Sequence, residues 1–261
     1  MGGRLARAVA AAAIVIAVTG CDMILGPAQT DTNWHTYDRG HFTFYVRPNS
    51  FAERSVDTLD AVLNDQFAVS VAALQLKYSG HIAMFLHNTG SEAGFGDDPG
   101  GGARSGVAYP KTETVKATCA PPLDAGLYSL LTHEANHVIA WNGLGRPGTT
   151  LLSESLANAL ISDHYQPGPA FFFHYTVTHR NELPRVASLA DDDKWTSVSS
   201  ELAYNVGASF LIYLLQTYGA TPMRAIYPVP SAEFAQRFKE AYGITLDQAE
   251  AAWLAFCDLH G

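Results

Sequence analysis

Two histidines lie four residues apart in the stretch LLTHEANHVIAW, residues 130–141, and a glutamate directly follows the first of them. On a helix, His133 and His137 lie one turn apart on the same face, so both imidazoles can bind one cation at about 2.0 to 2.1 Å. Glu134 is rotated by about 100° from His133, which places it beside such a cation and not on it. The spacing predicts two metal ligands and a neighbouring base; three polar residues that merely share a helix are the alternative.

Independent signals bound this helix. Asp124 follows two prolines and is a good N-cap, and Asn142 with Gly143 is a good stop signal. We therefore expect a helix over residues 124–141.

A catalytic zinc ion takes three protein ligands and leaves one position open, so a third ligand is expected downstream. A histidine six residues after His137 is absent, because Gly143 stands there. Residues 149–160 (TTLLSESLANAL) instead predict an amphipathic helix that returns after a short turn and carries Glu154 among leucines. We predict that Glu154 is the third ligand. One turn further, Asn158 is expected to accept the other ring N–H of a ligand histidine, and a solvated helix position is the alternative.

The first residues have the composition of an export signal. Two arginines precede an apolar run of eleven residues, 8–18, which is too short to span a bilayer as a helix. The adjoining VTGC, residues 18–21, resembles a bacterial lipobox, whose cysteine receives a lipid. We expect residues 1–20 to be a signal peptide and residues 21–33 a tether, with Cys21 anchoring an exported protein to a membrane that faces the periplasm or the cell exterior. A cleaved signal with an incidental cysteine is the alternative.

Lipidation of Cys21 would leave two cysteines, Cys119 and Cys257, in an oxidising compartment. A disulfide between them would close a long loop and could contribute as much as about 4 to 5 kcal/mol in the chain-entropy model. Two buried thiols are an equally good interpretation.

Composition indicates one compact domain over residues 34–261. Of the 261 residues, 48% are hydrophobic and 16% are charged, which is enough apolar material for a sizeable core. The net charge of -9 and the lack of a basic patch argue against a nucleic-acid partner.

Strand signals dominate the first half of the domain and helix signals the second. Residues 41–47, 81–86, 105–109 and 113–118 predict strands, and residues 51–76 predict a long amphipathic helix. Further helices are expected over residues 150–163, 200–218, 231–242 and 246–258. The Gly-rich segment 88–104 is expected at the surface or at the rim of a cleft, and the acids at 191–193 in a solvated turn. The predicted class is α+β: a small mixed sheet with a long helix, then a mainly helical part, with the site in a cleft between them.

The helix with the two histidines, followed after a short turn by LSESLA, resembles the gluzincins, the metallopeptidases related to thermolysin and aminopeptidase N. Residues 203–219 and 234–256 look like the C-terminal part of the compact peptidase MA-like domains of bacterial secreted proteins, so the resemblance covers most of the chain from about His41. It implies a zincin-like fold, one zinc ion and hydrolysis of peptide bonds, with Glu154 as the third ligand. Ser155 departs from the pattern, since many relatives carry glycine there.

The resemblance also implies how a substrate would be held. Relatives often use a downstream tyrosine or histidine as a donor to the developing oxyanion, and Tyr204 is the candidate here; a core tyrosine is the alternative. The peptide would pair with an exposed strand edge at residues 105–109. Replacing Val107 by proline is then expected to remove one edge N–H and to weaken hydrolysis.

Two other classes of protein would use these residues differently. A non-catalytic envelope lipoprotein could keep the fold to bind a peptide or protein partner or to act as a scaffold. A structural zinc site would normally have four protein ligands, often cysteines, and Cys119 and Cys257 lack the close spacing of such ligands. A zinc-dependent metallopeptidase with Glu134 as its general base is the main hypothesis.

Overall fold

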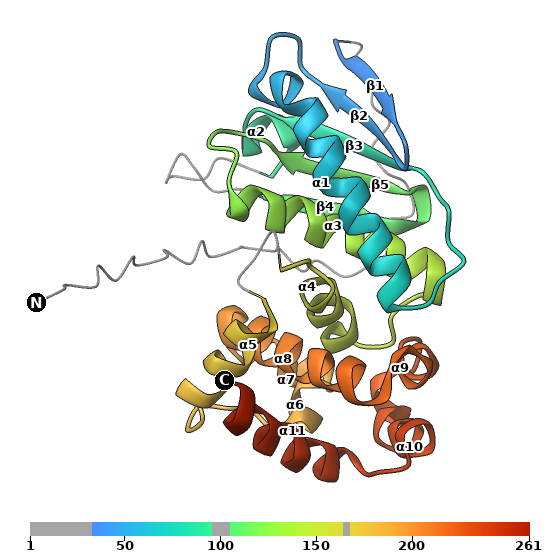
Figure 1. Ribbon diagram of the computed structural model, residues 1–261, viewed down its shortest axis with the longest axis vertical. Helices are drawn as coiled ribbons and strands as arrows, with labels where there is room; N and C mark the ends of the chain where they lie inside the picture. The colour runs from blue at the N-terminus through green and yellow to red at the C-terminus, as the bar shows by residue number, and fades with distance from the viewer. Residues whose placement is uncertain (1–32, 96–104, 164–167) are drawn as a thin grey trace, which may run out of the picture.

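A computed structural model describes residues 33–95, 105–163 and 168–261 (Figure 1). The predicted signal peptide, Cys21 and the tether up to residue 32 lie outside the described residues, as does most of the Gly-rich segment. Within the described ranges, every helix is too short or too polar to cross a membrane.

The N-terminal part is built on a five-stranded mixed sheet with the order β1-β2-β3-β5-β4. The strands are β1 (His35–Arg39), β2 (Phe42–Val46), β3 (Ile82–His87), β4 (Gly106–Tyr109) and β5 (Thr114–Thr118). The central strands β2, β3 and β5 are parallel, and β1 and β4 are antiparallel to their neighbours. The alternating burial of β2 and β3 follows their alternating sequence, because one face of the sheet is covered.

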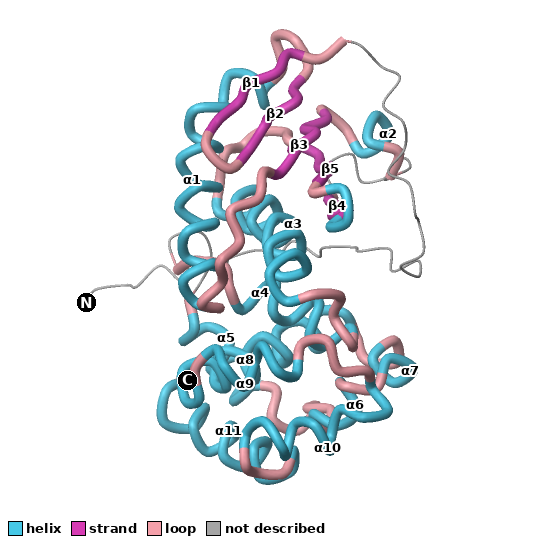
Figure 2. Tube along the Cα trace, turned by 90° about the vertical axis from the view of Figure 1, so that its right-hand side faces the viewer, coloured by secondary structure: helices cyan, strands magenta, loops and turns pink. Residues whose placement is uncertain are grey.

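Two helices cover that face. They are α1 (Phe51–Ala73) and α3 (Ala125–Leu144), and Figure 2 shows both on the same side of the strands. Ser50 and Asp124 cap them, since each side chain accepts a hydrogen bond from the backbone N–H three residues on. The core between sheet and helices contains residues such as Phe44, Leu63 and Leu131, all fully buried. This layer fixes α3, which carries His133 and His137, against the sheet.

The C-terminal part is helical and is organised around α8 (Ser200–Tyr218). A π-helical turn, η2 (Leu151–Ser155), runs directly into α4 (Leu156–Ala159). The remaining helices are α5 (Pro169–Thr178), α6 (Val186–Leu189), α7 (Asp192–Trp195), α9 (Ala220–Ile226), α10 (Ser231–Tyr242) and α11 (Leu246–His260). Two short elements complete the described chain, α2 (Gly90–Ala93) and the 3-10 turn η1 (Pro110–Thr112).

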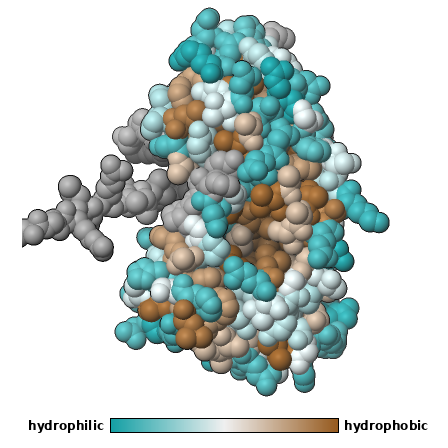
Figure 3. All heavy atoms as spheres, in the orientation of Figure 1, coloured by the Kyte–Doolittle hydropathy of each residue, from teal (hydrophilic) through white to brown (hydrophobic). Residues whose placement is uncertain are grey.

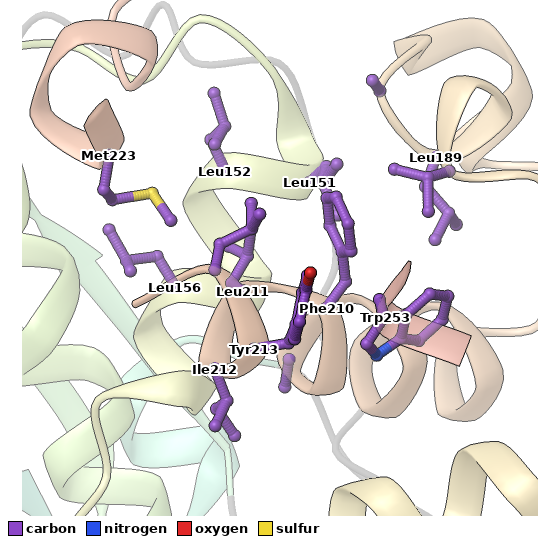
Figure 4. Packing of buried hydrophobic residues seen from close by; sticks show 14 of the residues in the cluster. Leu151, Leu152, Leu156, Leu189, Phe210, Leu211, Ile212, Tyr213, Met223 and Trp253 are labelled. Carbon is purple, nitrogen blue, oxygen red and sulfur yellow. The ribbon is translucent and has the colours of Figure 1, made fainter. Parts of the chain in front are cut away.

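Leucines of the return segment join the two parts. Leu151, Leu152 and Leu156 belong to the same buried cluster as Phe210 and Leu211 of α8, and Figure 4 shows Leu151 next to Phe210. Figure 3 shows apolar side chains gathered in a hollow at the waist of the molecule, where the sheet-bearing part meets the helical part. The segment that carries Glu154 is therefore anchored by burial of its apolar side chains.

The α+β class is confirmed, with a sheet and a long helix first and helices afterwards. The differences lie where local signals are weak. The sequence HTYDR forms the edge strand β1, although its side chains are mostly exposed and show no alternation. Residues 150–163, expected as one helix, form a π turn and a single α turn that ends at Ala159.

Of the two alternatives for Cys119 and Cys257, a disulfide or two buried thiols, the structure has the second. Both residues are buried thiols. Cys119 lies in the core beneath the sheet and Cys257 in the core of the helical part, so the two sulfurs belong to different clusters. A disulfide needs Cα atoms within about 7 Å of each other.

Candidate metal centre

Three predicted ligands meet at one point. The Nε2 atoms of His133 and His137 lie 3.0 Å apart. One carboxylate oxygen of Glu154, Oε2, lies 3.5 Å from Nε2 of His133 and 3.4 Å from Nε2 of His137. One donor atom from each of the three residues lies within 4.8 Å of the others, so this group could hold a metal ion.

The spacing of the three atoms suits a small tetrahedral ion. Ligands at about 2.0 to 2.1 Å from a tetrahedral centre are separated by about 3.3 Å, which follows from the geometry of a tetrahedron. The three observed separations are 3.0, 3.5 and 3.4 Å. The donor set therefore fits such an ion without large movement of any side chain.

The ring nitrogens that face away from this point are also engaged. Nδ1 of His133 lies 2.8 Å from Oδ1 of Asn158, so the ring N–H donates to the amide oxygen and leaves the Nε2 lone pair directed at the centre. Nδ1 of His137 lies 3.5 Å from Oγ of Ser153. Asn158 makes the contact predicted for it.

Glu154 is mostly buried and lies beside two histidines. Its side chain is 12% exposed, and those of His133 and His137 are 1% and 13% exposed. Burial alone would raise the pKa of the Glu154 carboxyl, but its interactions with His137 and His133 are stronger and hold the pKa well below its usual range. The carboxylate is therefore ionised at neutral pH.

Glu134 lies near the group formed by His133, His137 and Glu154 and is not part of it. The residue is 2% exposed, and burial raises the pKa of its carboxyl to about 7. Electrostatic interaction with His133 lowers the pKa, the nearby Glu154 raises it, and a hydrogen bond from the backbone N–H of Ala108 lowers it. A carboxyl with this pKa can both accept and release a proton near neutral pH.

Strand β4 approaches Glu134 closely and depends on glycine to do so. A Cβ atom on Gly106 would lie 2.7 Å from Cγ of Glu134, which is too close. In the described part of the chain, β4 is an edge strand. Its outer side therefore borders the Glu134 carboxylate.

The prediction that proline at Val107 removes an outward-facing N–H of the edge strand is wrong. The backbone N–H of Thr118 donates to the carbonyl of Ser105 at 2.8 Å, so alternate residues of β4, including Val107, bond to β5. The outward N–H groups belong to Gly106 and Ala108, and the second of these reaches Glu134. Proline at Val107 would break the ladder to β5 and would not remove an edge N–H.

Tyr204 reaches the centre from α8. Its hydroxyl donates to Oε2 of Glu154 at 3.0 Å, and its ring centroid lies 6.3 Å from that of His133. Burial and then the charge of Glu154 raise the pKa of the Tyr204 hydroxyl well above its usual value. The side chain is therefore a protonated hydrogen-bond donor at neutral pH.

Two positioning features of the Glu154 segment had little signal in the sequence. Glu154 lies within the π turn, a widened helical turn that is frequent at functional sites. The acids at 191–193, expected in a solvated turn, include the start of α7, and Oδ1 of Asp192 accepts the backbone N–H of Thr150 at 2.7 Å. Asp192 thus caps the segment that carries Glu154.

Ser155 packs against a glycine of α8, and this contact explains how serine is accommodated next to Glu154. A Cβ atom on Gly207 would lie 2.0 Å from Oγ of Ser155 and 3.0 Å from Cδ1 of Leu151. The Ser155 hydroxyl is buried and has no hydrogen-bond partner among the described residues. Glycine at position 207 thus leaves room for the Ser155 side chain.

Replacing Gly207 by alanine is expected to lower the free energy of unfolding by about 1 to 3 kcal/mol, because the added methyl group overpacks this contact. Adding Ser155→Gly should recover part of the loss, since it reopens the space. Urea unfolding of the single and double variants measures both effects. Unchanged stability of Gly207→Ala would show that α8 and η2 can move apart enough to accommodate the methyl group without loss of stability.

Comparison with known proteins identifies no family for this chain. A scan against protein-family models finds none that matches the chain, and a search of curated proteins finds no matching sequence.

Proposed function

We propose that this chain is a zinc-dependent metallopeptidase of the gluzincin type. One observation carries the proposal: two imidazole nitrogens and a carboxylate oxygen converge, and a second buried carboxylate, Glu134, lies beside them outside the donor set. The resemblance of the histidine helix and of LSESLA to the gluzincins supports the same assignment. Residues 1–21 support an exported lipoprotein, held at a membrane through Cys21.

The ligand chemistry favours zinc. Two imidazoles and one carboxylate form a donor set found in catalytic zinc sites, whereas magnesium and calcium prefer oxygen ligands throughout. When bound, zinc would polarise a substrate carbonyl and lower the pKa of a water molecule. The residues that would hold it are His133, His137 and Glu154.

Glu134 supplies the proton transfers in this proposal. Its carboxylate takes a proton from the attacking water and later delivers it to the leaving amine. The hydrogen bond from Ala108 holds the carboxylate at the edge of β4. A peptide paired with the remaining outward groups of β4, which include the N–H of Gly106, would pass next to Glu134.

The function is tested with purified, zinc-loaded protein. We expect one zinc ion per chain and cleavage of casein or of a peptide library, both lost on chelation and both restored by adding zinc. Elemental analysis and mass spectrometry of the products provide the readout. A zinc-loaded protein that cleaves no member of a broad library would instead support a non-catalytic envelope lipoprotein that binds or scaffolds a partner.

Replacing Tyr204 by phenylalanine is expected to lower kcat by about 10²- to 10³-fold, the effect of removing one donor to a developing oxyanion. Zinc content and KM should stay close to those of the wild type. Tyr213→Phe is a matched control, because Tyr213 is also buried on α8 but its ring packs against Tyr218 and Phe256 of the helical part. A variant that loses zinc affinity but keeps kcat when saturated with zinc would mean that Tyr204 only holds Glu154.

A further inference from the structure

A fully buried polar network connects α1, α3 and the end of α4. Asn136, between Glu134 and His137, accepts a hydrogen bond from Oγ of Ser70 at 2.6 Å. Its amide nitrogen donates to the carbonyl of Ala157 at 2.9 Å. Both Ser70 and Asn136 have 0% exposure. Asn136 thus ties the histidine helix to the backbone of the segment that carries the third ligand.

Gln66 of α1 holds the same segment at its C-terminal end. Its amide nitrogen donates to the carbonyl of Leu160 at 2.7 Å and to Oγ of Ser70 at 2.8 Å. Its amide oxygen accepts the backbone N–H of Ser162 at 2.8 Å. Gln66 has 0% exposure, so one side chain satisfies two backbone groups where α4 ends.

This network and the contact between Asn158 and His133 hold adjacent residues of the same segment. Asn136 fixes the carbonyl of Ala157, and the next residue, Asn158, contacts Nδ1 of His133. Glu154 lies one turn before Asn158. The positions of both side chains therefore depend on where this segment lies. Placing three uncharged polar side chains in an apolar core is unfavourable unless each is hydrogen bonded. Here their bonds converge on the backbone of residues 157–162.

We propose that Gln66, Ser70 and Asn136 are positioning residues that hold the Glu154 segment against His133 and His137 and thereby set the metal affinity. The inference rests on the proposed metal site. It assigns a role at that site to α1, which contributes no ligand.

Metal affinity distinguishes this role from a purely structural one. Gln66→Met keeps the approximate shape and removes the hydrogen bonds, and Asn136→Leu does the same on α3. We expect zinc and cobalt to bind about 10- to 100-fold more weakly, as on loss of groups that orient ligands in metal sites. The absorption bands of bound cobalt should shift as well, because Glu154 is displaced from the two histidines.

Ser209→Ala is the matched control. Ser209 has 0% exposure and accepts hydrogen bonds from Thr176 at 2.9 Å and from the Trp253 indole at 3.0 Å, in a network among α5, α8 and α11. We expect this variant to lose stability but to keep wild-type metal affinity and the wild-type cobalt spectrum. All titrations are made well below the unfolding temperature of each variant.

The milder Ser70→Ala serves if the larger changes prevent folding, and it should weaken metal binding by about 3- to 10-fold, less than the full loss of an orienting group. Wild-type affinity and spectrum in folded Gln66, Asn136 and Ser70 variants would overturn the inference, as would an equal loss in Ser209→Ala. A wild-type protein that binds neither zinc nor cobalt would overturn both this inference and the proposed function. A wild-type protein that binds metal but cleaves no peptide would overturn the peptidase proposal alone.

Discussion

Replacing Glu134 by glutamine is expected to lower kcat for peptide hydrolysis by about 10²- to 10⁴-fold, the usual contribution of a general base, while the protein still binds one zinc ion. Glutamine has the shape of glutamate but cannot accept a proton from water. The carboxylate lies outside the group formed by His133, His137 and Glu154, so its loss leaves the donor set intact. Steady-state kinetics on a cleaved peptide, with elemental analysis of the same sample, measures both quantities.

The control is a second partly buried glutamate. Glu250 has a side chain that is 12% exposed, pairs with Arg185 and accepts the backbone N–H of Val186, in the helical part. Glu250→Gln should leave kcat unchanged. Equal hydrolysis by wild type and Glu134→Gln would contradict the proposed proton transfers.

The grouping of His133, His137 and Glu154 could be predicted from the sequence because helical spacing determines it. The interval from His133 to His137 fixes two side chains on one face whatever the rest of the fold does. The leucines around Glu154 identify a buried face, and an acid next to such a face needs partners. The contact between Asn158 and His133 follows from the same spacing, once α3 and α4 pack against each other.

Other features depend on contacts between segments distant in the chain. Gln66 contacts backbone groups almost a hundred residues away, and no local pattern distinguishes it from a solvated glutamine. The π turn around Glu154 has no composition of its own, and the Asp192 cap needs α7 to fold back onto it. The error at Val107 has the same origin, because a strand sequence does not say which N–H groups face outward.

The choice between a disulfide and two thiols could not be made from the sequence for a related reason. Counting cysteines identifies candidates but not their distance. Cys119 directly follows β5 and Cys257 lies on α11, and each is buried in the core of its own part. The two thiols are apart because they are buried in two different hydrophobic cores.

Glu154→Gln and Glu134→Gln form a pair that tests the assignment of both glutamates. Both glutamate side chains are largely buried. Each substitution replaces a carboxylate by an amide of nearly the same shape. We expect Glu154→Gln to weaken zinc binding by at least about 100-fold, since removing a ligand should exceed the 10- to 100-fold effect of residues that only orient ligands. Glu134→Gln should bind zinc with wild-type affinity. Competition with a chromophoric chelator measures the two affinities.

The outcome separates three arrangements. If only Glu154→Gln loses zinc, the carboxylate between the two histidines is the ligand and Glu134 is the base. Loss of zinc in Glu134→Gln alone would exchange the roles and overturn the mechanism. Wild-type zinc affinity in both variants would mean that the two histidines bind zinc with a different third ligand, although Oε2 of Glu154 lies within 3.5 Å of both Nε2 atoms.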